Sequence, residues 1–555
     1  MRADRGAPAR RTPAEREETD MTDVQGNPLG RAAAPAQDAT LPDFLAWHAT
    51  GNAERAAIRE LRSGAVLGYA ELDHRVRQCM TALLGWLSHP FGKRVAMLSR
   101  NSLDLVTLHY ACARLGAVFV PLNWRLTGNE LRILVEDAGP ELLVCEEEFR
   151  DAGAEAIRGS TVHTVLSAGP DGNELAGAID AAEPIRHRPQ VPADAPVTLL
   201  YTSGTTGRPK GVIWTRQGAW YCELNFTFAS GVSPGDVFLC DVPMFHVSGL
   251  CAMTRGAICS GSTLIVSDRF TPANALALLS DPGTGATHYF AVPQMAQAMR
   301  AEPLFARADL RRLKALVVGG GPVPRALVEQ YLAEGVPLVD GYGLSEAGTV
   351  FGMPLDSATM VRKAGTSGVA APWIQVRLVD RAGNDVPDGE VGEIWLRGPS
   401  VTPGYWQRPE ATAEAITDGW VHTGDAAVRD RDGFYRLVDR WKDMYISGGE
   451  NVYPAEVEAV LLEISAVAEA AVVGVPDERW GESGCAWVVP ADPAAAAADP
   501  QALAEEIRSG CRERLARYKV PREVRFTDAL PRTGSGKVRK PLLRQAHAEG
   551  KPPLA

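Results

Sequence analysis

The chain has 555 residues and a formal net charge of −11, which comes from 68 acidic and 57 basic residues spread along the sequence. This length favours more than one domain, and a content of 45% hydrophobic and 23% charged residues is typical of a folded globular protein. The acidic balance and the lack of a basic stripe argue against a nucleic-acid-binding protein, so any bound anion is expected to be held locally.

The cysteine pattern and the start of the chain indicate a cytoplasmic protein. The nine cysteines stand singly, without CxxC pairs, so the sequence predicts neither a disulfide scaffold nor a zinc knuckle. Because each long apolar stretch is interrupted by polar or charged residues, we expect no membrane span. We interpret residues 1–40 as a disordered leader, and the sequence leaves open whether translation starts at Met1 or Met21.

From residue 41 onward, helical patterns alternate with short apolar runs, which predicts layers of helices and strands. The runs are VAMLS, AVFVPL, ELLVCEE, VTLLYTS and ALVVGGG. Around Gly389 the segments GEVGEIWLRGP and GFYRLVDRWKDMYISGG instead predict short strands joined by glycine turns. The first part of the chain is therefore expected to contain layered α/β subdomains and a β-rich subdomain.

A smaller α+β unit is predicted after ISGGENVYP. It contains a helix from about Ala455, the strand EAAVVGV, and a helix from Gln501 with one buried face. That face would consist of residues at i+4 spacing, namely Leu503, Ile507, Cys511 and Leu515. The segment PADPAAAAADP between the strand and the second helix is expected to be a surface loop.

The segment LLYTSGTTGRPKGV, Leu199 to Val212, predicts a phosphate-binding loop. Glycines let backbone N–H groups approach an anion, hydroxyl groups donate further hydrogen bonds, and a lysine supplies positive charge. The residues concerned are Thr202, Ser203, Gly204, Thr205, Thr206, Gly207 and Lys210. The chain contains neither the Walker motif of P-loop NTPases nor the glycine fingerprint of dinucleotide-binding domains.

Further motifs follow in a fixed order: GGGPVP (319–324), DGYGLSEAG (340–348), HTGD (422–425), DRWKDMYISGGENVYP (439–454) and PRTGSGK (531–537). Together with the phosphate loop, this set resembles the acyl-adenylate-forming enzymes, the superfamily of acyl-CoA synthetases, luciferases and peptide-synthetase adenylation domains. The resemblance extends from about residue 41 to residue 545. It implies an α/β N-terminal AMP-binding domain (41–441), a hinge at Lys442, and a small mobile α+β C-terminal domain (442–555) that rotates between two orientations.

The resemblance also implies the substrates and the residues that bind them. ATP and a carboxylic acid would form acyl-AMP and pyrophosphate, and the acyl group would then pass to coenzyme A. The implied catalytic residues are Lys537, Glu346 and Lys210, with Thr202 and Glu346 as ligands of Mg²⁺. Beyond the phosphate loop, the implied ATP-binding residues are Gly320, Gly341, Tyr342, Gly343, Ser345, Asp425 and Arg440, and those for coenzyme A are Gly448, Gly449 and Glu450.

The acid itself is expected to be hydrophobic, either fatty or aromatic. The resemblance places His246 and Val247 beside the acyl pocket, although a histidine between apolar residues also fits an ordinary core position. Further pocket residues are expected to be drawn from the helix around 220–228 and from the segments at Gly319 and 343–351, which are mostly apolar or small. The segment FHVS lacks the aspartate with which peptide-synthetase domains bind an amino group, so an amino acid is disfavoured.

Two alternatives stay open at this point. A ligase of the same superfamily could hand the acyl group to a carrier protein instead of coenzyme A. A serine hydrolase is the more remote alternative, because GLSEAG around Ser345 nearly matches a nucleophile elbow. The sequence also leaves open a homodimer and acetylation of Lys537 by a lysine acetyltransferase, since that lysine lies in a glycine-rich loop.

Overall fold

The structure is a computed structural model that describes residues 41–555, except 171, 188, 203–208, 322, 442, 448–449, 533–537, 552 and 554–555. The side chains of Arg440 and Asn451 are also outside the description. The predicted leader, residues 1–40, lies wholly outside the described residues. Among the described residues, no helix has both the length and the apolar character needed to cross a bilayer.

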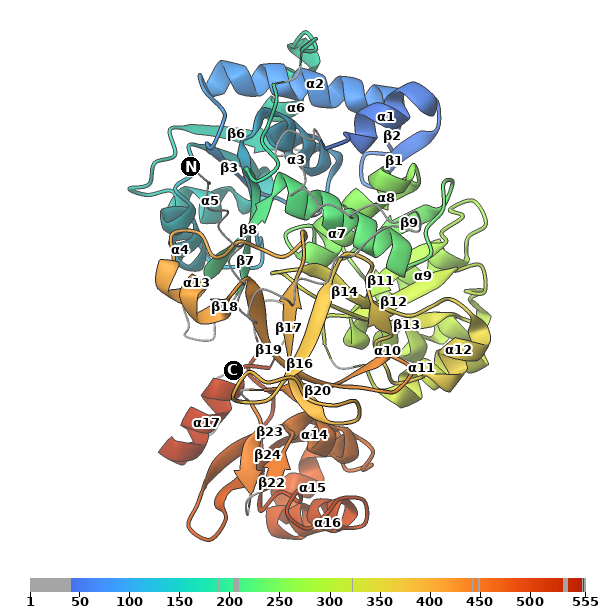
Figure 1. Cartoon of the computed structure of the whole chain (residues 1–555), viewed down its shortest axis with the longest axis vertical. Coiled ribbons are helices and arrows are strands. Elements are labelled where there is room, and N and C mark those ends of the chain that lie inside the picture. Colours follow the sequence, from blue (N-terminus) through green and yellow to red (C-terminus); the bar gives the residue numbers. More distant parts are fainter. Residues whose placement is uncertain are drawn as a thin grey trace, which may run out of the picture. The chain divides into compact units, whose positions relative to one another are not determined.

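The first α/β layer is a mostly parallel sheet in the order β6-β5-β3-β4-β7-β8 (Figure 1). β7 and β8 form an antiparallel hairpin at its edge. Four of the apolar runs predicted from the sequence are strands here, and β4 and β5 are buried along their whole length. The strands are β3 (Arg94–Leu98), β4 (Val118–Leu122), β5 (Leu142–Glu146), β6 (Thr164–Ala168), β7 (Pro196–Thr202) and β8 (Lys210–Thr215).

The second layer is a larger sheet in the order β15-β14-β13-β12-β11-β9-β10-β1-β2, parallel from β13 to β1 and antiparallel at both ends. Its strands are β1 (Ala56–Glu60), β2 (Val66–Gly68), β9 (Val237–Cys240), β10 (Thr263–Val266), β11 (His288–Ala291), β12 (Ala315–Gly319), β13 (Leu338–Leu344), β14 (Gly348–Gly352) and β15 (Val369–Ala370). Because parallel strands end at one edge, the motifs that follow β12 and β13 are brought together.

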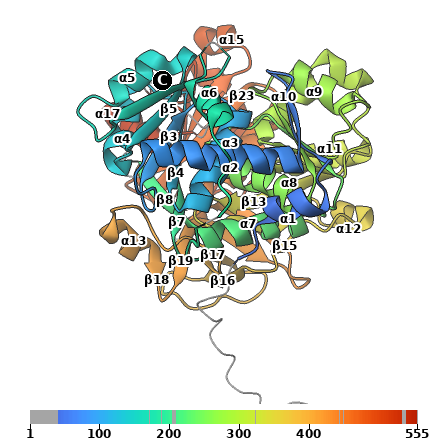
Figure 2. The same cartoon turned by 90° about the horizontal axis from the view of Figure 1, so that it is seen from above.

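Helices cover both sheets, and Figure 2 shows α2 lying across α3. α3 is almost entirely buried, begins at the N-cap Ser102, whose side chain accepts a hydrogen bond from the Leu105 N–H, and ends at Gly116 with φ 72°. The helices of this region are α1 (Phe44–Gly51), α2 (Tyr69–Trp86), α3 (Leu103–Leu115), α4 (Gly128–Ala138), α5 (Arg150–Ala156), α6 (Glu174–Ala181), α7 (Arg216–Ala229), the π-helix η3 (Ser248–Arg255), α8 (Gly256–Ser260), α9 (Pro272–Ser280), α10 (Pro293–Ala301), α11 (Arg325–Ala333) and α12 (Ser357–Arg362), with short 3₁₀ turns at Glu147–Phe149 and Pro303–Arg307.

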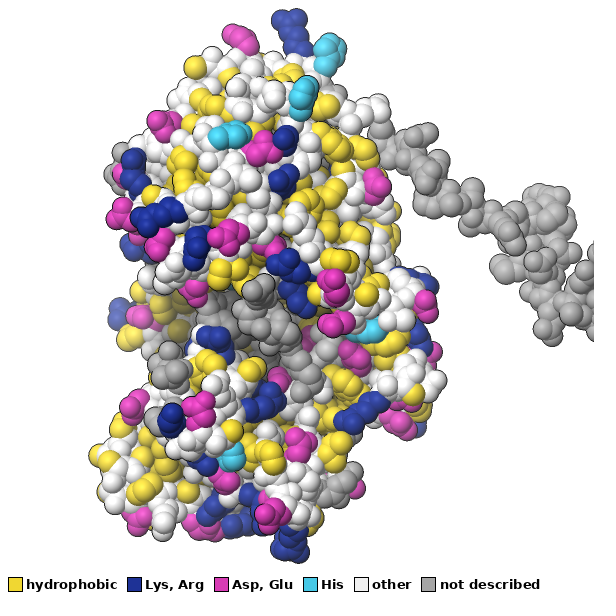
Figure 3. Space-filling model, turned by 90° about the vertical axis from the view of Figure 1, so that its left-hand side faces the viewer, with side chains coloured by type: hydrophobic (Ala, Val, Ile, Leu, Met, Phe, Trp, Pro, Cys, Tyr) yellow, Lys and Arg dark blue, Asp and Glu magenta, His cyan; other side chains and the backbone are white. Residues whose placement is uncertain are grey.

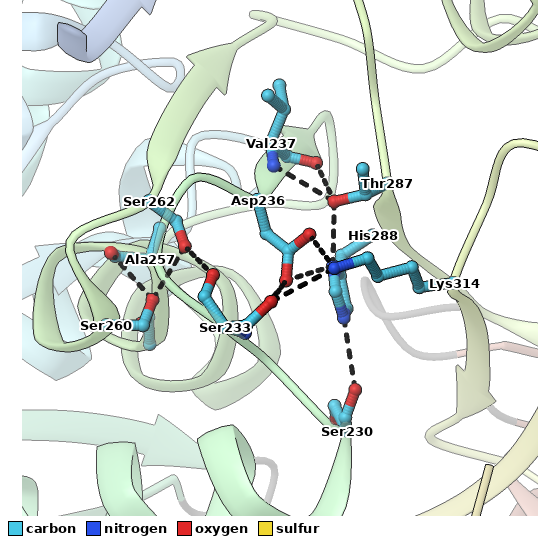
Figure 4. Close-up of polar contacts among 11 residues, drawn as sticks. Ser230, Ser233, Asp236, Val237, Ala257, Ser260, Ser262, Thr287, His288 and Lys314 are labelled. Carbon is cyan, nitrogen blue, oxygen red and sulfur yellow. Dashed lines mark hydrogen bonds and ion pairs between the residues drawn. The ribbon is translucent and has the colours of Figure 1, made fainter. Parts of the chain in front are cut away.

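A polar network closes the amino edge of the larger sheet, where β9, β11 and β12 begin (Figure 4). Asp236 is buried; its Oδ1 lies 2.7 Å from Nζ of Lys314, and its Oδ2 accepts hydrogen bonds from the N–H and hydroxyl groups of Ser233. His288 is buried beside it, with Nε2 3.0 Å from the Ser230 carbonyl oxygen. Burial lowers the pKa of His288, so its ring is neutral. This edge is filled by structural contacts, while the motifs lie at the opposite, carboxyl edge.

The two remaining sheets belong to the later part of the chain. The β-rich region contains the antiparallel strands β16 (Gln375–Val379), β17 (Val391–Arg397), β18 (Ile416–Thr417), β19 (Trp420–Arg429) and β20 (Tyr435–Arg440), with α13 (Pro409–Ala415) beside them. The C-terminal region contains β21 (Tyr445–Ser447), β22 (Glu450–Val452), β23 (Val467–Asp477), β24 (Gly481–Pro490) and β25 (Glu523–Phe526), with α14 (Pro454–Leu462), α15 (Pro493–Ala498), α16 (Pro500–Arg512) and α17 (Lys540–Glu549). The predicted fold class is confirmed.

Two local expectations in the C-terminal region are wrong. The segment PADPAAAAADP is not a loop, because Asp492 caps a short exposed helix, α15, through a hydrogen bond from the Ala494 N–H. The predicted helix from Gln501 ends at Arg512, so Leu515 lies beyond it. Leu515 still packs against the core that contains Leu503, Ile507 and Cys511, because its N–H donates a hydrogen bond to the Cys511 carbonyl oxygen over 2.8 Å and so continues the turn.

The surface and the cysteines agree with the expectations from composition. On the face that Figure 3 shows, acidic and basic side chains are interspersed over the described residues. All nine cysteines are described, and each is free and buried. No disulfide scaffold is present among them.

Candidate active site

The β7–β8 hairpin positions both ends of the predicted phosphate loop. Thr202 is the last residue of β7 and Lys210 the first of β8, and the two are antiparallel partners. Both side chains are half-buried. The loop between them, with Ser203, Gly204, Thr205, Thr206 and Gly207, lies outside the described residues. The described hairpin therefore fixes where the loop begins and ends.

The glycines after β12 and within β13 allow two backbones to approach closely at the carboxyl edge. Gly319 and Gly341 are partners in the parallel pair, and a Cβ atom on Gly319 would lie 2.5 Å from the Gly341 carbonyl oxygen. Gly320 follows with φ +84°, a conformation that favours glycine. At Gly343 a Cβ atom would lie 2.5 Å from the carbonyl oxygen of Gly348. A side chain is thus excluded at Gly319 and Gly343.

The residues expected to hold adenine and ribose contact each other. The hydroxyl of Tyr342 donates a hydrogen bond to Oδ2 of Asp425 over 2.7 Å, which joins β13 to β19. The Tyr342 ring stacks on Phe351 with 5.3 Å between ring centroids. Asp425 is the antiparallel partner of Arg440 in β20. One aromatic face and one carboxylate therefore meet where a nucleoside is expected.

Glu346 contacts a residue that sequence reasoning missed, Tyr405. The Tyr405 hydroxyl donates a hydrogen bond to Oε1 of Glu346 over 2.9 Å, and Nζ of Lys210 lies 5.0 Å from the centroid of the Tyr405 ring. Burial, together with the charge of Glu346, raises the pKa of Tyr405, so its hydroxyl keeps its proton and acts as a donor. Glu346 and Lys210, which the sequence places in separate motifs, thus both contact the side chain of Tyr405.

Backbone contacts hold Tyr405 in this position. Tyr405 forms an antiparallel bridge with Val212 of β8, and the Trp406 N–H donates to the Gly211 carbonyl oxygen over 2.7 Å. The Thr402 N–H donates to the carbonyl oxygen of Glu346, also over 2.7 Å. The segment 402–406 therefore joins the phosphate hairpin to the GLSEAG motif. Tyr405 lies 59 residues from Glu346, and no local spacing in the sequence indicates this contact.

A half-buried acid, Asp340, is a second residue of these motifs that sequence reasoning did not single out. It lies in β13 opposite Val318, directly before Gly341. Burial raises the pKa of Asp340 to about 7. A carboxyl group that is protonated near neutral pH can donate as well as accept a hydrogen bond. Its place in the DGYG motif puts it beside the expected nucleoside position.

The expected acyl-pocket residues follow β9 at the carboxyl edge. His246 and Val247 are half-buried, and the His246 carbonyl oxygen accepts a hydrogen bond from Leu250 at the start of η3. The His246 ring lies 4.5 Å from that of Phe245. In the neighbouring helix α7, Phe226 is buried, whereas Phe228 is 63% exposed and lies against Trp373. Any pocket residues drawn from the segment 220–228 therefore exclude Phe228, whose side chain is mostly exposed.

Several predicted residues of the last quarter of the chain lie outside the described residues, namely Lys442, Gly448, Gly449 and Lys537. Glu450, the next predicted residue, is exposed and pairs with Ser447 in the β21–β22 hairpin. Arg532 and Val538 form an antiparallel bridge on either side of residues 533–537. Ser345 is half-buried in the turn between β13 and β14. Lys442, Gly448 and Gly449 thus lie between described strands, and Lys537 lies between the two bridge residues.

The donor groups of the site fit a magnesium ion. Thr202 offers a hydroxyl oxygen and Glu346 a carboxylate, and hard oxygen ligands are those that Mg²⁺ prefers. The Tyr405 hydrogen bond to Oε1 orients the carboxylate.

Comparison with known proteins places this arrangement in a family. The chain belongs to the AMP-binding enzymes: residues 45–406 match the AMP-binding enzyme family, and residues 456–537 match the AMP-binding enzyme C-terminal domain. Both of these matches agree with the resemblance predicted from the motifs. The family is not one of serine hydrolases, so that alternative is removed.

Individual relatives are similar over nearly the whole described chain. A feruloyl-CoA synthase from Amycolatopsis is 42% identical over 489 residues, which are 87% of this chain and 94% of that protein. The fatty acid–acyl-carrier-protein ligase ScoC from Streptomyces coeruleorubidus is 34% identical over 516 residues, 91% of this chain and 96% of that protein. The o-succinylbenzoate CoA synthetase from Bacillus subtilis, solved with its acyl-adenylate intermediate, is similar with a TM-score of 0.80 and 30% identity, covering 93% of this chain and 99% of that one.

Proposed function

We propose that this protein is an AMP-forming ligase that activates an aromatic or fatty carboxylic acid with ATP and transfers the acyl group to coenzyme A. The observation that carries this proposal is the contact of one side chain, Tyr405, with both Glu346, which follows β13, and Lys210, which begins β8. It supports a site where a carboxylate and a cation face the same phosphate group. Feruloyl-CoA synthase and o-succinylbenzoate CoA synthetase, which resemble the chain, are named for aromatic acids.

The proposed first step is attack of the substrate carboxylate on the α-phosphorus of ATP, with pyrophosphate as the leaving group. Two anions approach each other in this step, so positive charge and donors must be held in place in advance. Lys210 would supply charge from the hairpin, and Lys537 would supply it from the segment between Arg532 and Val538. Bound Mg²⁺, held by Thr202 and Glu346, would neutralise phosphate charge.

The nucleoside would be held by groups that already contact one another. Tyr342 would lie against adenine, and Asp425 would accept hydrogen bonds from the ribose hydroxyls in place of the one it now accepts from Tyr342. Arg440, the neighbour of Asp425 in the sheet, would stay near the same end of the nucleotide. The glycines 320, 341 and 343 with Ser345 would leave room for the phosphates. His246 and Val247 would border the acyl group.

The proposed second step is attack of the coenzyme A thiol on the acyl-AMP carbonyl, with AMP as the leaving group. Gly448, Gly449 and Glu450 would line the path of the pantetheine, because glycines allow a ligand close to the backbone. The C-terminal domain, residues 442–555, would rotate about Lys442 between the two steps. In this proposal, residues 41–441 bind the substrates of adenylation. The C-terminal domain takes part in both steps, in a different orientation for each.

A panel of aromatic and fatty acids, assayed for pyrophosphate release, tests the reaction and its substrate class. We expect AMP as the nucleotide product and thioester formation with coenzyme A. Formation of ADP would contradict the proposal. Lys537→Ala should abolish acyl-AMP formation and leave the reaction of supplied acyl-AMP with coenzyme A largely intact, whereas Gly449→Leu should do the reverse. Equal impairment of both steps in both variants would contradict the rotation.

Transfer to a carrier protein is the second candidate, because the ScoC ligase, named for an acyl carrier protein, is also similar to the chain. The two candidates share the adenylation step and differ in the acceptor. Supplying acyl-AMP with either coenzyme A or a purified carrier protein separates them. Thioester formation only on the carrier protein would replace coenzyme A in the proposal.

Two further parts of the proposal concern regulation and assembly. Acetylation of Lys537 would remove its positive charge and so slow adenylation. Mass spectrometry of protein taken from cells tests this, and Lys537 found always unmodified would contradict it. A homodimer stays a prediction. Light scattering of the purified protein tests it by measuring the molar mass in solution.

A further inference from the structure

Three side chains with metal-binding groups converge in the C-terminal sheet. β24 and β25 are parallel, and their register places Cys485 opposite Glu523. The last turn of α17 brings His547 to the same point. The thiol sulfur, a carboxylate oxygen of Glu523 and a ring nitrogen of His547 all lie within 4.8 Å of one another. None of these residues takes part in the proposed ligase reaction.

The distances and the ligand types fit a zinc ion. Ligands bound to tetrahedral zinc at about 2.0–2.3 Å lie about 3.3–3.7 Å from one another. Nε2 of His547 lies 3.2 Å from Oε2 of Glu523, so the ring is already adjacent to the carboxylate whose other oxygen would bind the ion. Because the sulfur lies within 4.8 Å of the other two ligand atoms, it needs to approach them by at most about 1–1.5 Å. Thiolate and imidazole ligands favour zinc over magnesium or calcium.

The burial of the three residues gives the site a closed end and an open end. Cys485 is 0% exposed and lies in a core with Trp487 and Leu543. The side chains of Glu523 and His547 are 45% and 17% exposed. An ion could therefore enter past Glu523 and His547 and meet the sulfur at the bottom, with the remaining coordination position facing water.

The neighbouring Arg525 orients the carboxylate and leaves one of its oxygens for a metal. Nε and Nη2 of Arg525 both donate hydrogen bonds to Oε2 of Glu523, over 3.1 and 3.0 Å. Among the described residues, none makes a hydrogen bond or ion pair to Oε1 of Glu523. Such hydrogen bonds to a ligating carboxylate are typical of metal sites, because they fix its direction.

We propose that Cys485, Glu523 and His547 bind one Zn²⁺ ion, with a water molecule as the fourth ligand. The Cys485 thiol releases its proton to solvent when its sulfur binds the ion. The ion joins α17 to β24 and β25. In the chain, β25 precedes residues 533–537 and α17 follows them. By joining β25 to α17, the ion therefore stabilises the two elements that flank the segment with Lys537.

Cobalt substitution tests the proposal in the full-length protein. The chelator-treated protein, without ATP, is titrated with Co²⁺ and then with Zn²⁺. We expect one equivalent of Co²⁺ to give a near-ultraviolet thiolate-to-cobalt charge-transfer band with strong visible bands of tetrahedral cobalt, and Zn²⁺ to remove both. Zn²⁺ should also raise the melting temperature. A spectrum without the thiolate band would overturn the proposal and leave only a hydrogen-bonded Arg–Glu–His cluster.

Variants identify the ligands. Cys485→Ser should lose the charge-transfer band, whereas Cys511→Ser, which alters another fully buried cysteine of the same region, should keep it. His547→Gln and Glu523→Gln change partly exposed side chains, so these variants should fold. Because loss of even an outer-shell partner costs about 10- to 100-fold in metal affinity, each should weaken Zn²⁺ binding at least tenfold. Unchanged affinity in both, or loss of the band in Cys511→Ser, would contradict the assignment.

Discussion

The Tyr405 hydroxyl donates a hydrogen bond to Oε1 of Glu346 over 2.9 Å, while the face of the same ring lies 5.0 Å from Nζ of Lys210. One neutral aromatic side chain thus contacts both an anion and a cation, the carboxylate through its hydroxyl and the ammonium group through its ring. This relationship makes Tyr405 a positioning residue for the proposed adenylation step.

Tyr405→Phe should slow adenylation without unfolding the protein. The variant keeps the ring beside Lys210 and loses only the hydrogen bond to the carboxylate. A hydrogen bond to a charged group contributes about 1.5–3 kcal/mol, so we expect a loss of about 10- to 100-fold in kcat/KM and a higher Mg²⁺ requirement. Acid-dependent exchange of pyrophosphate into ATP, measured over a range of Mg²⁺ concentrations, checks both effects.

The control for Tyr405→Phe is Tyr331→Phe. The Tyr331 hydroxyl donates a buried hydrogen bond to the Ala296 carbonyl oxygen and does not contact Glu346. It should lower stability and leave the Mg²⁺ dependence unchanged. An unchanged Mg²⁺ dependence in Tyr405→Phe as well would show that the contact with Glu346 has no part in binding the metal.

Glu346→Gln should reduce adenylation by about 100-fold, a magnitude typical of losing one group that stabilises transition-state charge. The amide keeps the shape of the carboxylate and can still accept the Tyr405 hydrogen bond, so the fold should persist. Pyrophosphate exchange at limiting Mg²⁺ measures the loss, and circular dichroism checks the fold. Near-normal activity at limiting Mg²⁺ would remove Glu346 from the proposed metal site.

Lys442→Pro should separate the two half-reactions. Lys442 lies outside the described residues, so this prediction rests on the sequence motif alone. Proline fixes φ at about −65° and would hamper rotation at a hinge. We expect acyl-AMP to form while little thioester is released, whereas Lys442→Ala, which keeps the backbone free to rotate, should release thioester at a near-normal rate. Equal thioester rates in the two variants would place the hinge elsewhere.

Asp241→Asn should flatten the dependence of stability on pH. Asp241 is buried and accepts a hydrogen bond from the Tyr289 hydroxyl, and burial raises its pKa from 3.8 to about 7. The folded protein therefore holds this proton at pH values where the unfolded chain has lost it. The stability that this proton contributes is full below about pH 4 and is lost as the pH rises to about 7. Asparagine is neutral at each pH, so that part of the loss should disappear.

Urea unfolding midpoints between about pH 4 and 7 measure this effect. Asp340 and Glu223, whose pKa values burial also raises to about 7, remain in the variant, so its slope should shrink without reaching zero. Asp309→Asn is the control, because the exposed carboxyl of Asp309 beside Arg311 has its pKa lowered to about 2. Its titration lies below the measured window. Identical slopes in Asp241→Asn and the unmodified protein would contradict the prediction.

The sequence by itself determined the family, the strands and the order of the motifs. Apolar runs such as AVFVPL and ELLVCEE became β4 and β5, because consecutive buried residues are required where helices cover both faces of a parallel sheet. The motifs around Gly320, Tyr342 and Asp425 were found because each lies within a few residues of the chain, where residue type and spacing carry the signal. Local errors, such as the loop expected at α15, arose where a single capping residue decided the structure.

The tertiary structure alone decided which distant residues meet. Tyr405 contacts Glu346 across 59 residues of chain, and Cys485, Glu523 and His547 come together from two strands and a helix. Neither the Tyr405–Glu346 pair nor the set of Cys485, Glu523 and His547 shows a regular spacing in the sequence that would indicate the contact. Strand register and helix packing create these contacts, and both depend on the whole buried core. The sequence therefore revealed the chemistry of the motifs, and the fold determined the partners that position them.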